Sequence, residues 1–158
     1  MNNKQPIFTE ANQKNIWQKI DEIALVLMRF DRDCDPFLMY GEAGIQLFLF
    51  HRCFELDDEE CYAKVTDKYF QKIDNIHKKI LYINDPQECN ACLADGLGGI
   101  GWMLDYMIRY PMIEADLFDV MGSVDPKIFR RMIYDIQEDR YDLLQGAVGI
   151  ALYCVNRN

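Results

Sequence analysis

The chain has 158 residues and a mass of 18.6 kDa, carries a formal net charge of −9, and is 50% hydrophobic and 13% aromatic. A chain of this size buries roughly 70% of its unfolded surface when it folds, so we predict one globular domain over residues 1–158 and exclude disorder. The 26 acidic residues outnumber the 17 basic ones, which argues against nucleic acid and acidic membrane surfaces as partners.

The sequence predicts neither a membrane span nor a secretory signal. The longest uncharged run, residues 143–156, falls short of the roughly 18 apolar residues that a span needs. Residues 1–6 lack the apolar core of a signal peptide. We therefore expect a cytoplasmic protein whose six cysteines are reduced thiols.

The first predicted element is an amphipathic helix that leads into a glycine motif. Its apolar stripe has helical spacing and consists of Ile16, Ile20, Ile23, Ala24, Leu27 and Met28. The motif Gly41-x-x-Gly44-Ile45 follows Leu38 and opens the apolar run 45–50. Because this run is apolar on nearly every side, it predicts a buried helix.

The same order of elements recurs twice. A second stripe over residues 62–83 precedes Gly96, Gly99 and the apolar run 100–107. A third stripe over residues 128–136 follows Asp125-Pro126, which predicts a capped helix start. It precedes Gly146, Gly149 and the apolar run 150–155. Three similar segments at a near-constant spacing of about fifty residues indicate a repeat protein.

The alternation of amphipathic and buried helices predicts an all-α fold of helical hairpins, of the kind that closes into an α/α toroid. The two glycines of each motif lie on one helix face, where a neighbouring backbone can approach closely. Alternatively, the first glycine of each pair ends a loop before the helix begins.

These motifs resemble the lanthionine synthetase C-like family of peptide cyclases. The nearest match is residues 141–150, Tyr-Asp-Leu-Leu-Gln-Gly-Ala-Val-Gly-Ile, which is similar to the family's aspartate motif. The resemblance implies an α/α toroid, here a partial one of about three hairpins. It also implies a zinc ion that activates a peptide cysteine for addition to a dehydrated serine or threonine, and a peptide as substrate.

The chain departs from the family pattern at the metal ligands. Family members carry a cysteine after a tryptophan and a Cys-His pair before a glycine, but Trp17 and Trp102 are followed by Gln18 and Met103. We therefore expect no zinc in this chain and zinc only in a full-length parent, of which the chain is the N-terminal part. The alternative is a shortened relative that has lost the metal site.

Asp142 is the candidate catalytic residue, because the resemblance places it at the family's aspartate, where it handles a proton or orients the substrate. The ordinary alternative is a helix N-cap. We interpret Asp95 as a cap as well, and Glu42 as a first-turn carboxylate that favours the helix dipole.

The remaining cysteines and charges have ordinary interpretations. We expect Cys89-x-x-Cys92 to be two reduced thiols in a turn rather than half of a zinc site, and Cys53 and Cys154 to be small core residues. The acidic clusters 31–35 and 55–60 are predicted to be solvated turns, with recognition of a basic peptide as the sharper alternative.

The sequence leaves three functional hypotheses. The first is a zinc-dependent peptide cyclase, to which this chain contributes Asp142. The second is a non-enzymatic peptide-binding or assembly module that forms homo-oligomers through exposed inner helices. The third is a glycoside hydrolase in which Asp142 pairs with Asp95 or Glu42, because that chemistry needs two carboxylates.

Overall fold

A computed structural model describes residues 9–29, 35–80 and 85–157. In these ranges the chain forms helices and no strand, which confirms the predicted all-α fold class. The chain divides into two compact units, residues 1–32 and 33–158. The helices are α1 Glu10–Met28, α2 Glu42–Leu56, α3 Glu59–Ile80, α4 Leu97–Arg109, α5 Leu117–Met121, α6 Asp125–Gln137 and α7 Ala147–Asn156.

The first unit contains α1, the predicted N-terminal amphipathic helix. Thr9 is its N-cap, and the Thr9 side chain accepts a hydrogen bond from the Asn12 N–H at 3.3 Å. Of the predicted apolar stripe only Ala24 is buried, while Ile16 and Ile23 are exposed. The helix is therefore correctly predicted.

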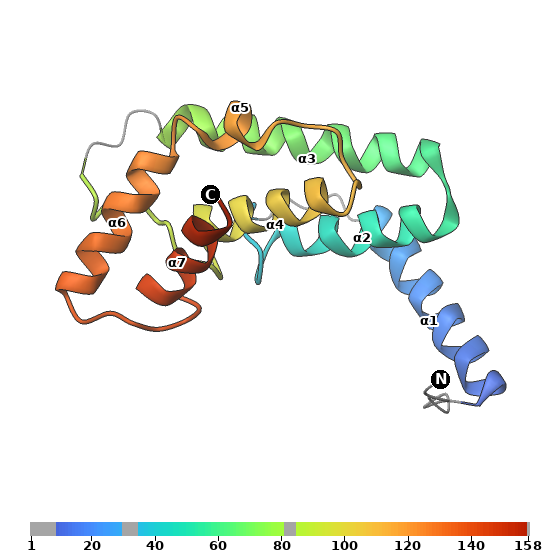
Figure 1. Ribbon diagram of the computed structural model, residues 1–158. Coiled ribbons are helices and arrows are strands. Elements are labelled where there is room, and N and C mark those ends of the chain that lie inside the picture. Colours follow the sequence, from blue (N-terminus) through green and yellow to red (C-terminus); the bar gives the residue numbers. More distant parts are fainter. Residues whose placement is uncertain (1–8, 30–34, 81–84, 158) are drawn as a thin grey trace, which may run out of the picture. The chain divides into compact units, whose positions relative to one another are not determined.

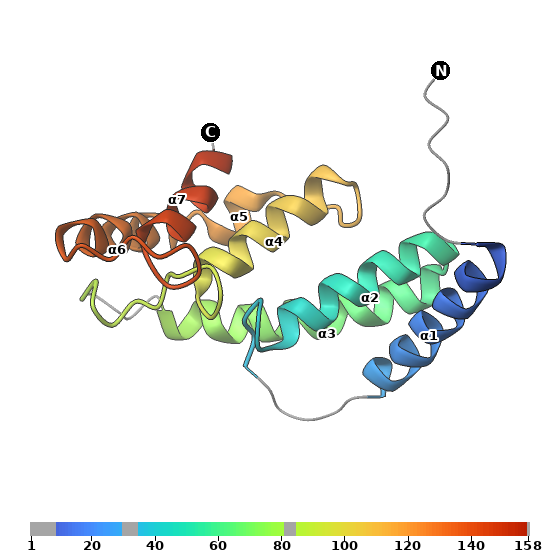
Figure 2. The ribbon, with the colours of Figure 1, turned by 90° about the horizontal axis from the view of Figure 1, so that it is seen from below.

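In the second unit, three helices that follow glycine motifs lie side by side. Figure 1 shows α4 between α2 and α7, and helix contacts join α2 to α4 and α4 to α7. Figure 2 shows the amphipathic helix α3 against α2, and α6 packs against α7. This arrangement confirms the predicted alternation of amphipathic and inner helices.

The inner helices differ in how completely they are buried. Ile100, Met103 and Leu104 of α4 are buried, since α4 has an inner helix on each side. In α7, Leu152 is 44% exposed and Val155 is 70% exposed. The prediction of a helix buried on all sides is thus correct for α4 and wrong for α7.

Other predicted boundaries need correction or lie outside the described residues. The second stripe extends to Ile83, but α3 ends at Ile80 and residues 81–84 are not described. The side chains of Ile73, Ile76 and Ile80 are also outside the description. The short helix α5 was not predicted; Asp116 caps it by accepting from the Phe118 N–H at 2.7 Å.

Asp125 does not cap α6. The N-cap residue is Val124, and Asp125 is the first residue of the helix. Its carboxylate instead accepts hydrogen bonds from Tyr153 and Arg157 of α7. The interaction between helices takes the place of the predicted local cap.

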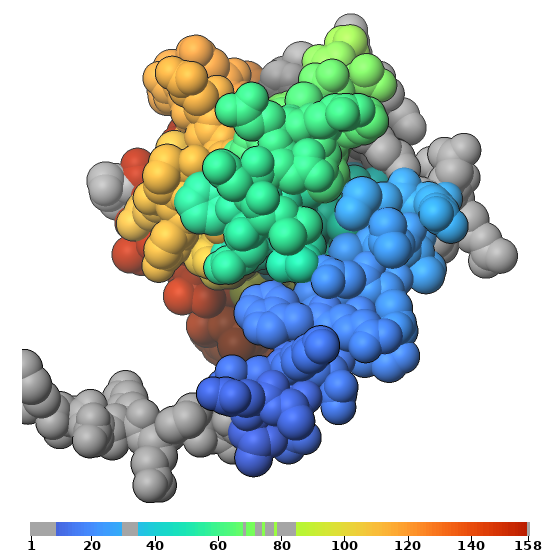
Figure 3. Space-filling model, turned by 90° about the vertical axis from the view of Figure 1, so that its right-hand side faces the viewer, coloured from blue at the N-terminus to red at the C-terminus, as the bar shows by residue number. Residues whose placement is uncertain are grey.

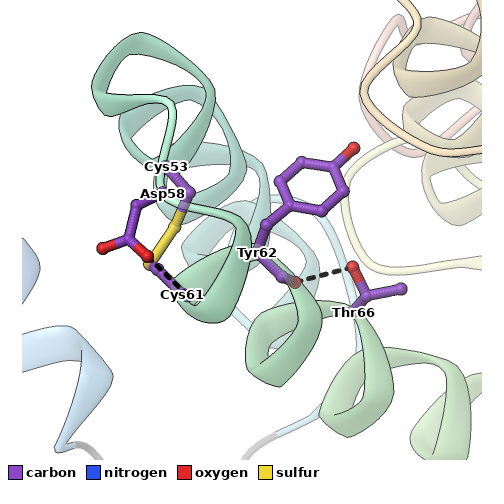
Figure 4. Close-up of a disulfide and its surroundings, with 5 residues drawn as sticks. All are labelled: Cys53, Asp58, Cys61, Tyr62 and Thr66. Atoms are coloured by element: carbon purple, nitrogen blue, oxygen red, sulfur yellow. Dashed lines mark hydrogen bonds between the residues drawn. A yellow bond between two sulfur atoms is a disulfide. The ribbon is translucent and has the colours of Figure 1, made fainter.

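The prediction of six reduced cysteines is wrong for two of them. Cys53 near the end of α2 and Cys61 in the first turn of α3 form a disulfide, with Cα atoms 5.9 Å apart (Figure 4). Asp57 adopts a left-handed conformation (φ 54°) that reverses the chain, and the Asp58 carboxylate accepts from the Cys61 N–H at 2.9 Å. Cys89, Cys92 and Cys154 are free thiols, and Cys34 lies outside the described residues.

The residues of the acidic cluster 55–60, at and beside this turn, are all exposed, as predicted for a solvated segment. Most of the cluster 31–35 falls outside the described residues. Among the helices that the structure describes, none combines the length and the apolar character needed to cross a bilayer.

Candidate functional site

The same turn precedes α2, α4 and α7. In each case the N–H that follows the first glycine donates to a carbonyl seven residues earlier. The bonds are Glu42 to Asp35 at 2.7 Å, Leu97 to Asn90 at 3.0 Å and Ala147 to Arg140 at 2.8 Å. The chain therefore folds back over the start of each inner helix, and these hydrogen bonds satisfy N–H groups that lack helical partners.

The motif glycines are required because this turn leaves no room for a side chain. Gly41, Gly96 and Gly146 are the N-cap residues, and a Cβ on each would lie under 3.0 Å from the carbonyl oxygen six residues earlier. Gly44, Gly99 and Gly149 meet the carbonyl oxygens of Leu38, Leu93 and Leu143 in the same way. None of these glycines has a positive φ, so steric space rather than backbone freedom selects them.

The turns also join one repeat to the next. The Met39 N–H donates to the Ala94 carbonyl at 2.9 Å, and the Ala94 N–H donates to the Leu144 carbonyl at 2.8 Å. A Cβ on Gly99 would lie 3.1 Å from the Leu38 Cβ, and one on Gly149 would lie 2.9 Å from the Leu93 Cβ. We call this pair of contacts, one hydrogen bond and one glycine against a leucine, the glycine joint.

Asp142 lies in the turn before α7. Its Oδ1 accepts hydrogen bonds from the Leu144 and Gln145 N–H groups, each at 2.8 Å. Because Gly146 is the N-cap residue of α7, Asp142 caps the turn and not the helix, which corrects the N-cap interpretation. The residue is exposed, and within the described part of the chain its Oδ2 has no hydrogen-bond partner.

Asp95 does not cap α4 either, because Gly96 is the N-cap residue of that helix. Its Oδ1 accepts from the Cys92 thiol at 2.6 Å. Burial and this hydrogen bond raise the pKa of Cys92 to about 11, and burial raises the pKa of Cys89 above its ordinary value. Both cysteines are free and lie in the loop before α4, as expected, and their raised pKa values make them poor nucleophiles at neutral pH.

Glu42 belongs to a buried polar cluster that the sequence did not predict. It lies in the first turn of α2, as expected, but it is buried and accepts from the Gln46 Nε2 at 2.6 Å. Burial, together with the Glu42 charge, raises the pKa of the buried Tyr69 of α3. The only sequence feature that could have indicated this cluster is the acidic residue at a position where the other two repeats have Leu97 and Ala147. Burial also removes Glu42 as a surface carboxylate for the glycoside hydrolase hypothesis.

A second pairing that the sequence missed joins α2 to α4. The His51 Nε2 and the Tyr106 hydroxyl lie 3.1 Å apart, and the Trp102 ring stacks on Tyr106 with centroids 5.7 Å apart. Tyr106 is 55 residues from His51 in the sequence, so no local pattern indicates this pairing.

The described residues do not fit a zinc site. Within residues 9–29, 35–80 and 85–157, His, Cys, Asp and Glu form no group of three or more that could hold a metal ion. A catalytic zinc needs three protein ligands, so we derive no step through zinc.

Comparison with models of known families matches residues 33–158 to Lanthionine synthetase C-like protein. The chain belongs to this family. The LanC-like region coincides with the second compact unit, which contains the three glycine turns. Its helical hairpins are therefore part of a LanC-like α/α toroid. No curated protein and no solved structure matches the chain.

Proposed function

We propose that this LanC-like chain contributes to thioether formation in peptides, with Asp142 as its proton-handling residue. The observation that carries the proposal is the anchored carboxylate: two backbone N–H groups hold Oδ1, and the side chain is exposed. The substrate class is a peptide with a cysteine and a dehydrated serine or threonine.

The reaction balances without an outside oxidant or reductant. A peptide thiol adds across a carbon–carbon double bond, so that a sulfur–carbon bond forms and the thiol proton ends on the neighbouring carbon. Asp142 Oδ2 would hold that proton between the two positions, while Oδ1 keeps the carboxylate in place through Leu144 and Gln145.

Asp142→Asn tests this role, because the amide oxygen still accepts the two backbone hydrogen bonds while the charge is lost. In the full-length protein we expect cyclisation of a peptide bearing dehydroalanine and cysteine to slow by about 100-fold or more. The measurement is the loss of alkylatable thiol at constant peptide mass. Asp119→Asn, at an exposed carboxylate of α5, is the charge-matched control. Undiminished cyclisation by Asp142→Asn would sink the proposal.

The second candidate is a non-enzymatic assembly or peptide-binding module. It is favoured by large apolar side chains that remain exposed on the third repeat, namely Phe129, Ile133, Ile136, Leu143, Leu144, Val148, Leu152 and Val155. Exposed apolar side chains in this number favour a surface that binds another protein. A monodisperse monomer across a concentration series would contradict assembly through this surface.

A further inference from the structure

The disulfide of the α2–α3 turn presents its two cysteines unequally to solvent. Cys53, in the last turn of α2, is 1% exposed. Cys61, in the first turn of α3, keeps part of its surface open to solvent. The rate of thiol–disulfide exchange depends on access to the sulfur that is attacked. An external thiol therefore reaches this disulfide at Cys61 and not at Cys53.

Non-covalent contacts hold the two cysteines together as well. The Asp58 N–H donates to the Cys53 carbonyl at 3.1 Å, and the Asp58 carboxylate accepts from the Cys61 N–H at 2.9 Å (Figure 4). Next to the turn, the rings of Phe50 and Tyr62 pack α2 against α3 with centroids 5.3 Å apart. None of these contacts uses a sulfur atom. The Cys53 thiol therefore stays within reach of Cys61 after the disulfide opens.

The surroundings of the disulfide are strongly acidic. Residues 55–60 contain five carboxylates and no basic residue, and all of them are exposed. Lys64 of α3 pairs with one of these carboxylates, that of Glu60, at 2.6 Å. Because the attacking species is a thiolate anion, this segment repels it unless the same molecule also carries a positive charge.

We propose that the Cys53–Cys61 disulfide is a thiol-exchange site. Cys61 accepts a small thiol as a mixed disulfide, and the buried Cys53 is the resolving cysteine that expels it again. The favoured reactant is a thiol that carries a cationic group. The inference goes beyond thioether formation and does not depend on the chemistry proposed for Asp142.

The exchange balances in atoms and electrons. The thiolate of the external thiol attacks Cys61 Sγ, a new sulfur–sulfur bond forms, and the bond between Cys61 and Cys53 breaks. The electron pair of the broken bond goes to Cys53 Sγ, which takes up a proton. A second thiol molecule then attacks the bound one, so that two external thiols are oxidised to one disulfide and the protein disulfide is reduced to two thiols.

The first test locates the mixed disulfide. The oxidised 158-residue chain reacts briefly with cysteamine, a small cationic thiol, and excess N-ethylmaleimide stops the reaction. Both cysteines lie in the tryptic peptide 53–64, so tandem mass spectrometry distinguishes them. We expect cysteamine on Cys61 and maleimide on Cys53, in at least about tenfold excess over the reverse arrangement.

Two single variants test the roles separately. In Cys53→Ala, the free Cys61 should form a lasting mixed disulfide with cystamine, because no resolving cysteine remains. In Cys61→Ala, the buried Cys53 should react at least about 100-fold more slowly, and urea should abolish the difference. Circular dichroism checks that both variants fold.

The charge preference has its own readout. Salt should accelerate reduction by 3-mercaptopropionate, whose reactive form has two negative charges, at least about threefold more than reduction by cysteamine. Glu55→Gln with Glu59→Gln should weaken this salt effect. Glu88→Gln with Glu138→Gln, at exposed carboxylates outside the turn, is the charge-matched control and should leave it unchanged.

Three results would overturn the inference. An adduct on Cys53, or equal adducts on both cysteines, contradicts the two roles. A disulfide that cysteamine reduces in urea but not in the folded chain excludes an accessible exchange site. Equal salt effects for the two thiols contradict the preference for a cationic reactant. Cyclisation assays of Asp142→Asn are a separate measurement, so failure here leaves the proposed function standing.

Discussion

The helix pairs α2–α3 and α6–α7 have the same architecture but are held together differently. The α2–α3 turn, which faces the viewer in Figure 3, is closed covalently by Cys53 and Cys61. The α6–α7 pair is instead held by a charged group. The Asp125 carboxylate of α6 accepts hydrogen bonds from the Tyr153 hydroxyl of α7 at 2.5 Å and from Arg157.

Arg131 of α6 forms a further ion pair within its own helix and also binds the loop before α4. Arg131 donates from Nε to the buried Asp135 at 3.0 Å, and its Nη1 donates to the carbonyls of Pro86, Gln87 and Cys89 at 3.0–3.3 Å. A disulfide does not depend on charge, whereas a buried ion pair becomes a liability when one partner is removed. We therefore expect a reductant to destabilise the α2–α3 pair, and the loss of a charged side chain to destabilise the contacts of α6.

The largest expected effect is at Arg131. Arg131→Met leaves the buried Asp135 carboxylate without its nearest cation and frees three loop carbonyls, which should lower the free energy of unfolding by about 3–5 kcal/mol. Urea denaturation measures the loss. Arg130→Met, at the exposed neighbour on the same helix, should cost about 0.5 kcal/mol or less. Equal losses for the two variants would contradict the role given to the buried pair.

Reduction of the disulfide should have the next largest effect. Opening a loop of this length costs about 2–3 kcal/mol through the greater entropy of the unfolded chain. The measurement compares urea midpoints with and without a phosphine reductant. Cys154→Ser is the control, because Cys154 is a free thiol and its replacement should leave the response to reductant unchanged. A thiol titration that finds all six cysteines free would refute the covalent link.

The smallest expected effects on stability are those of removing the hydroxyl groups of two buried tyrosines. Tyr153→Phe removes a hydrogen bond to a charged group and should cost about 1.5–3 kcal/mol. Tyr69→Phe removes a buried hydroxyl for which the described residues supply no partner, so its effect should be neutral or stabilising by up to about 1 kcal/mol. Thermal unfolding of both variants distinguishes the paired hydroxyl from the unpaired one. A loss at Tyr69 as large as that at Tyr153 would contradict this distinction.

The alkaline limb of the stability curve provides a second readout for Tyr153. Burial and the hydrogen bond to Asp125 raise the pKa of Tyr153 above its ordinary value of 10.0. Above pH 10 the unfolded tyrosine ionises while the folded one stays protonated, so stability falls as the pH rises. The difference in the free energy of unfolding between the unmodified chain and Tyr153→Phe should therefore shrink above pH 10 and stay constant below it.

Local pattern was enough to predict most of the helices and the family. The apolar stripe at 128–136 and the runs at 45–50, 100–107 and 150–155 all lie on helices, because helical periodicity depends only on neighbouring residues. The glycine motifs were also visible, since each turn closes over only seven residues. The Asp142 role in catalysis stays a prediction, although its two backbone hydrogen bonds are now assigned.

The sequence by itself thus determined the all-α class, the alternation of helices and the repeated glycine turns. Only the tertiary structure decided the burial of Glu42, the exposure of α7 and the contacts between successive glycine turns. The physical reason is distance along the chain: Arg131 meets carbonyls more than forty residues earlier, and Ala94 meets Leu144 fifty residues later. Such contacts exist only once the helices have packed, because packing and not local periodicity brings these groups together.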